Sequence, residues 1–459
     1  MIYNDGSDEI HDALANLAIT TLATSGAVTL GAQATTGITV GGIPFYYGDT
    51  GSIYTHDVSG TDSTAQYNTA YGLTALDAIT TGDSNVAVGY AAGSAITTGG
   101  NNTLIGYQAG DALTDGSRNT ALGISALGSE TSGVSNTAIG ASALVSSNGG
   151  NYNTAVGDQA GVLLTTGDNN QFMGYHAGYG NTSGSNNIAI GYQAYDVADT
   201  EGNNLAIGNA ALGGSVAGGE YNVAVGNYAL DALTSADYSV AVGYEAGSAI
   251  TTGGNNTLMG YQAGANITTG TNNTGVGIQA LYNFDTEGNN TAFGQSALGG
   301  AIAGGEFNVA VGNLSLSALT SGDSNTAIGY ESGKANTTGF QNTFLGNEAG
   351  TSFTTGNDSI FIGYRAGHDC TTGSDIIFIG KNAGDAHDTE GNNLGIGSNA
   401  LGGPIAGGEF NVAIGNAALV ALTSGDNNTA VGYNAGTALT TGEATTAIGD
   451  SALMTTTTG

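Results

Sequence analysis

The sequence predicts an all-β fold: a parallel β-solenoid, or β-roll, of about 23 coils with a 17-residue period. The main observation behind this prediction is a glycine that recurs 23 times from Gly72 to Gly449 and follows an apolar residue or, once, Tyr71. Of the 22 intervals between these glycines, 19 span 17 residues and three span 18. A fixed period of this size is typical of repeats that stack into a solenoid.

The composition is the second observation. The 459 residues are 40% hydrophobic, which is too apolar for an acidic disordered chain, and the 81 glycines do not recur at every third position as in collagen. Charge is one-sided, since 37 Asp and Glu against 4 Lys and Arg give a net charge of −33. Without a basic patch, a nucleic acid partner is not expected. Cys370 is the single cysteine, so an internal disulfide is excluded.

We count positions within a coil from the repeated glycine, which is position 0. Position −1 is almost always apolar, as in Val88 and Ile105, and we expect it to face a dry interior. Position −4 is Asn in 19 of the 23 repeats. Stacked Asn side chains could bond to one another as a ladder, or each could be a turn residue that begins a strand. Both roles are structural.

Two further columns describe the packing after the glycine. Position +3 is Ala in 21 repeats, which predicts a site where only a small side chain fits. Tyr occupies position +1 nine times, and in eight of these repeats position +4 is Gly. Tyr90 with Gly93 is one example, whereas Tyr192 with Tyr195 breaks the pattern. This exchange of large and small residues predicts that positions +1 and +4 pack into one shared space.

Both faces of the expected strand are largely apolar. Stretches such as NTAVG place small or apolar residues at successive positions, and successive strand residues point to opposite faces. One face fills the narrow interior of the coil. The other needs a cover, which we expect from further copies of the chain, packed or intertwined as a homotrimer. At about 4.8 Å per coil, the array would form a rod of roughly 105 Å.

The three 18-residue intervals fall in near-identical blocks that begin with LGG. Each block adds one residue to the loop and places an acidic side chain there: Glu220, Glu306 and Glu409. We interpret the blocks as products of duplication, and a dedicated ion site is the alternative.

No arrangement of residues predicts catalysis, a cofactor or a metal centre, and we do not expect an enzyme. The histidines occupy unrelated positions, so stacking creates no metal-binding column, and we interpret all five as surface or turn residues: His11, His56, His176, His368 and His387. Cys370 shares position +7 with Leu and Phe residues of other coils and is predicted to lie in the core. Asp occupies position +11 in five coils that are too far apart for a calcium ladder: Asp83, Asp168, Asp237, Asp323 and Asp426. Isolated Ca²⁺ ions are an alternative that the sequence leaves open.

Residues 1–66 lie outside the repeat, and we expect them to cap the solenoid or attach it to a larger assembly, while residues 67–459 form the shaft. Ile10, Leu14 and Leu17 have helical spacing, and the residues that follow them up to Gly48 favour short strands. An acidic start without the pattern of a secretory signal, and the lack of a long apolar stretch, favour synthesis in a cytoplasm and no membrane insertion. Gly459 stops in register with the repeat, which predicts that the natural protein continues or that another chain covers this end.

The NTAVGYNAG and NNIAIGYQA stretches resemble the head repeats of trimeric autotransporter adhesins and similar repeats of phage tail fibres. The resemblance covers residues 68–449 and implies a left-handed parallel β-roll that forms a homotrimer. Two departures are a period longer than that of the adhesin head and the absence of a signal peptide and membrane anchor. We therefore expect a virion protein: a phage tail-fibre shaft, assembled in the host cytoplasm.

Such a shaft would use its N-terminal segment to bind a phage tail or other particle protein, and could contact a host surface glycan or protein. A bacterial adhesin at the cell surface is one alternative. An ice-binding solenoid is the other, although its flat arrays need Thr-Xaa-Thr and the Thr pairs here are adjacent, as in Thr97 and Thr98.

Overall fold

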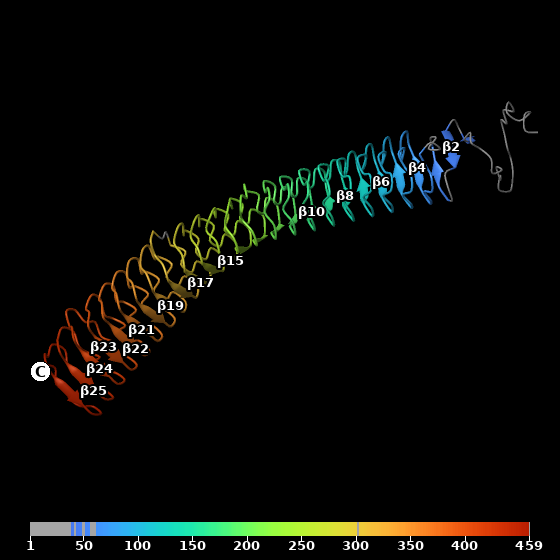
Figure 1. Cartoon of the computed structure of the whole chain (residues 1–459). Coiled ribbons are helices and arrows are strands. Elements are labelled where there is room, and N and C mark those ends of the chain that lie inside the picture. Colours follow the sequence, from blue (N-terminus) through green and yellow to red (C-terminus); the bar gives the residue numbers. More distant parts are fainter. Residues whose placement is uncertain (1–37, 41–42, 48–50, 56–60, 301–302, 459) are drawn as a thin grey trace, which may run out of the picture.

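The computed structural model describes residues 38–40, 43–47, 51–55, 61–300 and 303–458, and these form a long, curved rod of stacked coils (Figure 1). The described residues form strands, turns, bends and irregular loops, and no helix is among them. This confirms the all-β parallel solenoid of about 23 coils with a period near 17 residues. The short helix expected around Ile10, Leu14 and Leu17 lies outside the described residues.

Three strands precede the first regular coil. β1 (Ile38–Val40) and β2 (Ile43–Tyr47) pair antiparallel, and β3 (Ile53–Tyr54) pairs antiparallel with β2. β3 also pairs in parallel with β4 (Thr69–Tyr71), the strand of the first coil. The short strands expected before residue 48 are therefore present at β1 and β2, and they connect through β3 to the edge of the solenoid.

From β4 onward, each coil contributes one three-residue strand at positions −3 to −1. Neighbouring strands pair parallel and in register, so that Thr69 lies beside Val86. The series is β5 (Val86–Val88), β6 (Thr103–Ile105), β7 (Thr120–Leu122), β8 (Thr137–Ile139), β9 (Thr154–Val156), β10 (Gln171–Met173), β11 (Ile188–Ile190), β12 (Leu205–Ile207), β13 (Val223–Val225), β14 (Val240–Val242), β15 (Thr257–Met259), β16 (Thr274–Val276), β17 (Thr291–Phe293), β18 (Val309–Val311), β19 (Thr326–Ile328), β20 (Thr343–Leu345), β21 (Ile360–Ile362), β22 (Ile377–Ile379), β23 (Leu394–Ile396), β24 (Val412–Ile414), β25 (Thr429–Val431) and β26 (Thr446–Ile448).

The glycine at position 0 ends each strand in a conformation that other residues rarely adopt. Its φ angle is +137° at Gly89 and +143° at Gly106. A Cβ atom on Gly89 would also stand 2.3 Å from the carbonyl oxygen of Gly106 in the next coil. Backbone conformation and stacking thus both require glycine here, which explains the strict period.

The Asn column at position −4 forms a ladder inside the solenoid. The side-chain Oδ1 of Asn68 accepts a hydrogen bond of 2.8 Å from the backbone N–H of Asn85, and its Nδ2 donates one of 2.8 Å to the carbonyl of Gly82. Each amide therefore bonds forward along the rod and also holds the turn that precedes the strand of the next coil. The ladder is confirmed, with bonds that run mainly from side chain to backbone, and the turn that each Asn supports is that of the next coil.

The interior of the coil is filled by positions −2, +3, +4 and +7. The strand contributes only its middle residue, such as Ala87 or Leu104, and both are fully buried. The prediction that position −1 faces this interior was wrong. Ile105 is 37% exposed and Met173 is 49% exposed, because a three-residue strand that directs its middle residue inward directs both ends outward. The Ala at position +3 is buried as predicted, for example Ala109.

The predicted exchange between positions +1 and +4 has a different basis. Tyr90 at position +1 is 47% exposed and Leu127 at position +4 is fully buried, so the two positions do not share a space. The exchange lies between positions −2 and +4. A Cβ atom on Gly178 would stand 2.5 Å from the ring of Phe172, and one on Gly161 in the preceding coil would stand 2.7 Å from it. Every large residue at position −2 has Gly at position +4 in its own coil and in the coil before: Leu104, Phe172, Leu258, Phe344, Phe361 and Phe378.

Candidate functional site

The side chains at positions −3 and −1 of β4 to β26 form what we call the outer sheet face. Position −3 holds Thr, Val, Ile, Leu or Gln, and position −1 holds Val, Ile, Leu, Met, Phe or Tyr. The chain has 37 acidic and 4 basic residues, yet none of them lies at these positions. Leu122 is 45% exposed on this face and Leu345 is 42% exposed. Soluble monomers rarely expose a continuous apolar surface of this kind, so this stripe is a candidate contact surface.

Exposed tyrosines at position +1 lie next to the outer sheet face and stack between coils. The rings of Tyr90 and Tyr107 are 5.3 Å apart and nearly parallel, and those of Tyr244 and Tyr261 are 5.6 Å apart. Stacked rings at this spacing attract one another. They extend the apolar surface beyond the strands.

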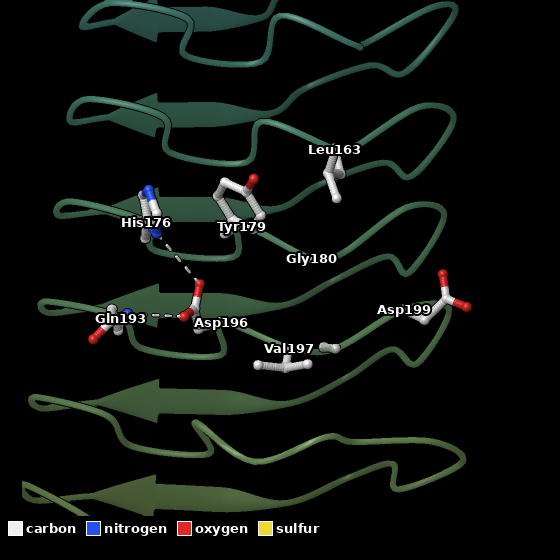
Figure 2. A pocket seen from close by; sticks show the side chains of 9 residues that line it. Leu163, His176, Tyr179, Gly180, Gln193, Asp196, Val197 and Asp199 are labelled. Carbon is white, nitrogen blue, oxygen red and sulfur yellow. Dashed lines mark hydrogen bonds and ion pairs between the residues drawn. The ribbon is translucent and has the colours of Figure 1, made fainter.

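A groove of about 510 Å³ crosses the coils of β10 and β11 and the coil before them (Figure 2). Its floor and walls come from position +6, which holds Leu163, Gly180 and Val197 in successive coils. Leu163 is 41% exposed and Val197 is 50% exposed, whereas Gly180 between them has no side chain. These are the only Leu and Val at position +6 in the sequence. The groove is therefore a notch between two apolar side chains.

Polar and aromatic side chains form one end of the groove (Figure 2). The ring of His176 lies 4.4 Å from that of Tyr179, and its Nδ1 is 3.8 Å from Oδ1 of Asp196. Gln193 Nε2 donates a hydrogen bond of 3.1 Å to Oδ2 of the same carboxylate. Burial raises the pKa of Asp196, and the nearby His176 opposes this change. Asp199 lies at the other end and accepts a hydrogen bond of 2.5 Å from the Thr182 hydroxyl.

Tyr195 explains why this coil departs from its neighbours. It occupies position +4, where other coils have Leu or Gly, and it is fully buried. Its hydroxyl donates a hydrogen bond of 2.9 Å to the carbonyl of Glu201 and accepts one of 3.1 Å from Nδ2 of Asn204. Tyr195 thus fixes the turn that follows Asp196 and Val197.

The histidines have three different environments. His176 lies in the groove, and His368 lies at the surface with Nε2 3.8 Å from Oε2 of Glu348. His387 contradicts the prediction of a surface or turn residue, because its position +7 points into the core. It is fully buried with its ring 4.7 Å from that of Phe378, and burial lowers its pKa to about 4 although Glu390 opposes this change. His11 and His56 lie outside the described residues.

Cys370 lies in the core as predicted. It is fully buried, and its Sγ is 3.9 Å from the carbonyl oxygen of Gly384 in the next coil. Burial raises the pKa of this thiol well above its usual value, with nearby carboxylates such as Glu390 adding to the effect. A thiol that stays protonated is a poor nucleophile, so Cys370 has the properties of a packing residue.

The acidic column at position +11 has a structural use. Oδ1 of Asp83 accepts a hydrogen bond of 2.8 Å from the backbone N–H of Gln66, one coil earlier. The same bond is made by the other four members, Asp168, Asp237, Asp323 and Asp426. Within the described residues no three His, Cys, Asp or Glu side chains are grouped to hold a metal ion. Isolated Ca²⁺ ions stay a prediction.

A set of buried glutamates was missed by the sequence reasoning. Glu201 is 6% exposed, and its carboxylate accepts hydrogen bonds from the backbone N–H groups of Asp199, Thr200 and Gly218. Gly218 lies in the enlarged loop of the following 18-residue interval. Glu287 and Glu390 hold the other two enlarged loops in the same way, through Gly304 and Gly407. The recurring DTEGNN before each interval was the available signal.

The paired threonines engage the solenoid itself. Thr80 donates its hydroxyl to the carbonyl of Thr97 at 2.9 Å, and Thr320 does the same to Thr337 at 2.9 Å. The hydroxyl hydrogens of these residues are therefore used between coils, where they strengthen the stack.

No protein-family model matches the chain, and no curated protein matches it. Within the described part of the chain, no helix is long and apolar enough to cross a membrane.

Proposed function

We propose that this protein is the shaft of a fibre, built to span distance and to associate laterally with copies of itself through the outer sheet face. The specific form we favour is a homotrimeric phage tail-fibre shaft in a virion, whose residues 1–66 bind a tail or other particle protein. The site chemistry described above gives no reason to add catalysis to this role.

The observation that carries the proposal is the uncharged outer sheet face. It follows the rod through all the coils from β4 to β26, in a chain with a net charge of −33. Self-association of acidic rods is opposed by charge repulsion unless the contact surface excludes carboxylates. The distribution of Asp and Glu away from the strands meets that condition.

Three copies are favoured over two by the width of the apolar surface. The strand ends face one direction and the Tyr column at position +1 extends the surface around one side, as at Tyr107, which is 50% exposed. Cyclic arrangement of three rods would cover both parts on every copy, because each rod would contact two neighbours. The resemblance to the heads of trimeric adhesins and to tail-fibre repeats supports the same number.

Sedimentation equilibrium of the full chain tests the proposal directly. We expect the mass of three 44.9 kDa chains, and a monomer at micromolar concentration would contradict the shared surface. Ile190→Asp on β11 would bring three carboxylates together at the axis, so we expect this variant to dissociate while its circular dichroism stays that of the parent. Leu163→Asp is the matched control, because Leu163 is equally apolar and lies at position +6, away from the strand ends.

A further inference from the structure

We infer that the groove formed by Leu163, Gly180 and Val197 binds a neutral pyranose sugar, as one unit of a surface glycan. The shaft would then recognise a ligand along its side and not only span distance. The inference names a partner for the proposed fibre, but it does not depend on assembly because one chain supplies the whole groove.

The apolar parts of the groove suit a sugar ring. A pyranose has one face of C–H groups, which needs contact with aliphatic or aromatic surface, and a rim of hydroxyls. Leu163 and Val197 stand on either side of Gly180 and present exposed aliphatic surface, and the Tyr179 ring borders the same space (Figure 2). The missing side chain at Gly180 is enforced, since a Cβ atom there would stand 2.8 Å from the carbonyl oxygen of Asp196.

The polar groups sit at the two ends of this apolar surface. Gln193 and Asp196 lie at one end, and Asp199 at the other (Figure 2). Carboxylate and amide groups on either side of an apolar floor can accept and donate hydrogen bonds to hydroxyls at opposite edges of one ring. Two carboxylates in a chain of net charge −33 disfavour acidic sugars, so the proposal is restricted to neutral ones.

An organic cation is the competing occupant, and the existing contacts argue against it. Asp196 already has Gln193 as a donor and His176 3.8 Å away, and Asp199 has the Thr182 hydroxyl. Asp199 is exposed, so water can solvate its charge, whereas Oδ1 of Asp196 is buried without a hydrogen-bond donor. An oxygen that lacks a donor favours a ligand with hydroxyls over a quaternary ammonium ion, which has no N–H to donate. A ligand with neutral hydroxyls uses the remaining lone pairs without needing to neutralise the site.

The groove stays open if the rods associate through the outer sheet face. Phe172 of β10 directs its ring inward toward Gly178 at position +4, whereas its neighbour Met173 points outward and is 49% exposed. Gly180 at position +6 comes two residues after Gly178, in the part of the coil that lies across the core from the strand. A partner that covers Met173 therefore lies across the coil from Gly180. One that also covers the Tyr column at position +1 comes nearest to the groove at His176, whose ring is 4.0 Å from that of Tyr175. A homotrimer would display three grooves and gain avidity for a multivalent glycan.

The test uses the full chain on an array of immobilised neutral hexose and N-acetylhexosamine oligosaccharides, with sialylated and uronic acid oligosaccharides beside them. We expect binding to a subset of the neutral probes, and at least a tenfold loss in affinity for Leu163→Ser/Val197→Ser. Phe340→Ser is the matched control, since Phe340 is 41% exposed at position +11 of another coil, outside both the groove and the outer sheet face, and this variant should bind like the parent. Both substituted groove residues are largely exposed, so the variant is expected to fold.

Several outcomes would overturn the inference: no neutral probe is bound, the double variant binds as well as the parent, or choline and spermidine compete and neutral sugars do not. Sedimentation separates this result from the proposed fibre, because Leu163→Ser/Val197→Ser should still be a trimer. Conversely, monomeric Ile190→Asp should bind a soluble neutral oligosaccharide with the affinity of a single parent groove. Loss of sugar binding in that monomer would show that the groove is not built by one chain.

Discussion

Two segments of the rod share the same backbone arrangement but fill their cores with residues of different size. The alanine segment, β7 to β9, has Ala121, Ala138 and Ala155 at the strand centres. In the phenylalanine segment, β20 to β22, the strand centres are large: Phe344, Phe361 and Phe378. Both pair in the same parallel register. The coil therefore keeps its shape while its interior is filled in two different ways.

The size of the residue at the strand centre is compensated by position +4, in the part of the coil opposite the strand. Leu127 and Leu144 fill the interior of the alanine segment from position +4, whereas Gly350 and Gly367 make room in the phenylalanine segment. Close-packed interiors require this, because neither a void nor an overlap of one ring can be absorbed by a narrow coil.

The two segments also differ in polar support. The Asn ladder is continuous through Asn119, Asn136 and Asn153. In the phenylalanine segment Ser359 still takes part, because its backbone N–H donates to Oδ1 of Asn342 and its hydroxyl accepts a hydrogen bond of 3.3 Å from the backbone N–H of Ile376. The ladder is broken at Ile376, where stacked rings continue the core, with Phe361 and Phe378 5.8 Å apart. At that coil apolar contact replaces the side-chain hydrogen bond between coils.

The largest expected effect is that of Phe361→Ala. Phe361 is fully buried, and Gly350 and Gly367 leave nothing to fill the space, so we expect the coils of β20 to β22 to lose about 3–5 kcal/mol of local stability. Hydrogen exchange of the β20 to β22 amides, read by mass spectrometry, measures this locally. Unchanged protection there would contradict the role assigned to the ring.

His387, at the end of the phenylalanine segment, predicts a pH effect nearly as large. Its pKa is lowered from 6.5 to about 4 in the folded chain, so the unfolded chain binds the proton more readily between these values. Stability is therefore undiminished above about pH 6.5 and falls by up to about 3 kcal/mol as the pH drops to about 4. Urea unfolding of His387→Leu should show a smaller loss than the parent over this range. Both chains should carry Glu390→Gln for this comparison, because His387 is one of the groups that lower the pKa of Glu390 and the titration of that carboxylate would otherwise differ between them.

Ala138→Phe would convert one coil of the alanine segment. With Leu127 and Leu144 in place the ring is overpacked, and we expect a loss of about 1–3 kcal/mol. Adding Leu127→Gly and Leu144→Gly should restore part of that loss in urea unfolding, because the triple variant has the arrangement found around Phe172. If the triple variant is less stable than the single one, a large residue at position −2 does not require Gly at position +4.

The smallest effect concerns the ladder. Asn136→Ser shortens a side chain whose Nδ2 donates a hydrogen bond of 2.7 Å to the carbonyl of Gly150, and we expect a loss of about 1 kcal/mol. Ser359→Asn in the phenylalanine segment is the reciprocal change and should gain a similar amount. Thermal unfolding followed by circular dichroism compares the pair, and equal shifts in the same direction would show that the ladder contributes nothing.

The period and the parallel stacking could be predicted because a single requirement, the glycine at position 0, repeats in every coil. Which strand residues point into the core could not be predicted. Val, Ile and Ala fit either face of the strand, and a three-residue strand is too short to show an alternation of apolar and polar residues. Ile105 was placed inside for this reason. The exchange of large and small residues was assigned to positions +1 and +4 because Tyr at position +1 often accompanies Gly at position +4. The space beside each Gly at position +4 is filled instead by position −2 of the same coil and of the next coil, as by Phe172.

The groove could be predicted from the sequence only in part. Leu163, Gly180 and Val197 are departures at position +6, but a departure shows no cavity until the coils are stacked. His387 had a clearer signal, since it shares position +7 with Cys370, which was correctly placed in the core. His387 was nevertheless predicted at the surface because histidine is a polar residue, and the apolar character of position +7 was given less weight.

Because the coils are so alike, the gene that encodes them would be prone to unequal recombination, which deletes or duplicates whole repeats. Each such event would change the rod by about 4.8 Å and leave the glycine column in register. The pairing of a large strand residue with Gly in the coil before it limits which junctions survive. A deletion that placed the Leu127 coil directly before the Phe361 coil would overfill the core. Length can therefore vary between lineages in whole coils, but only at breakpoints whose neighbouring interiors match.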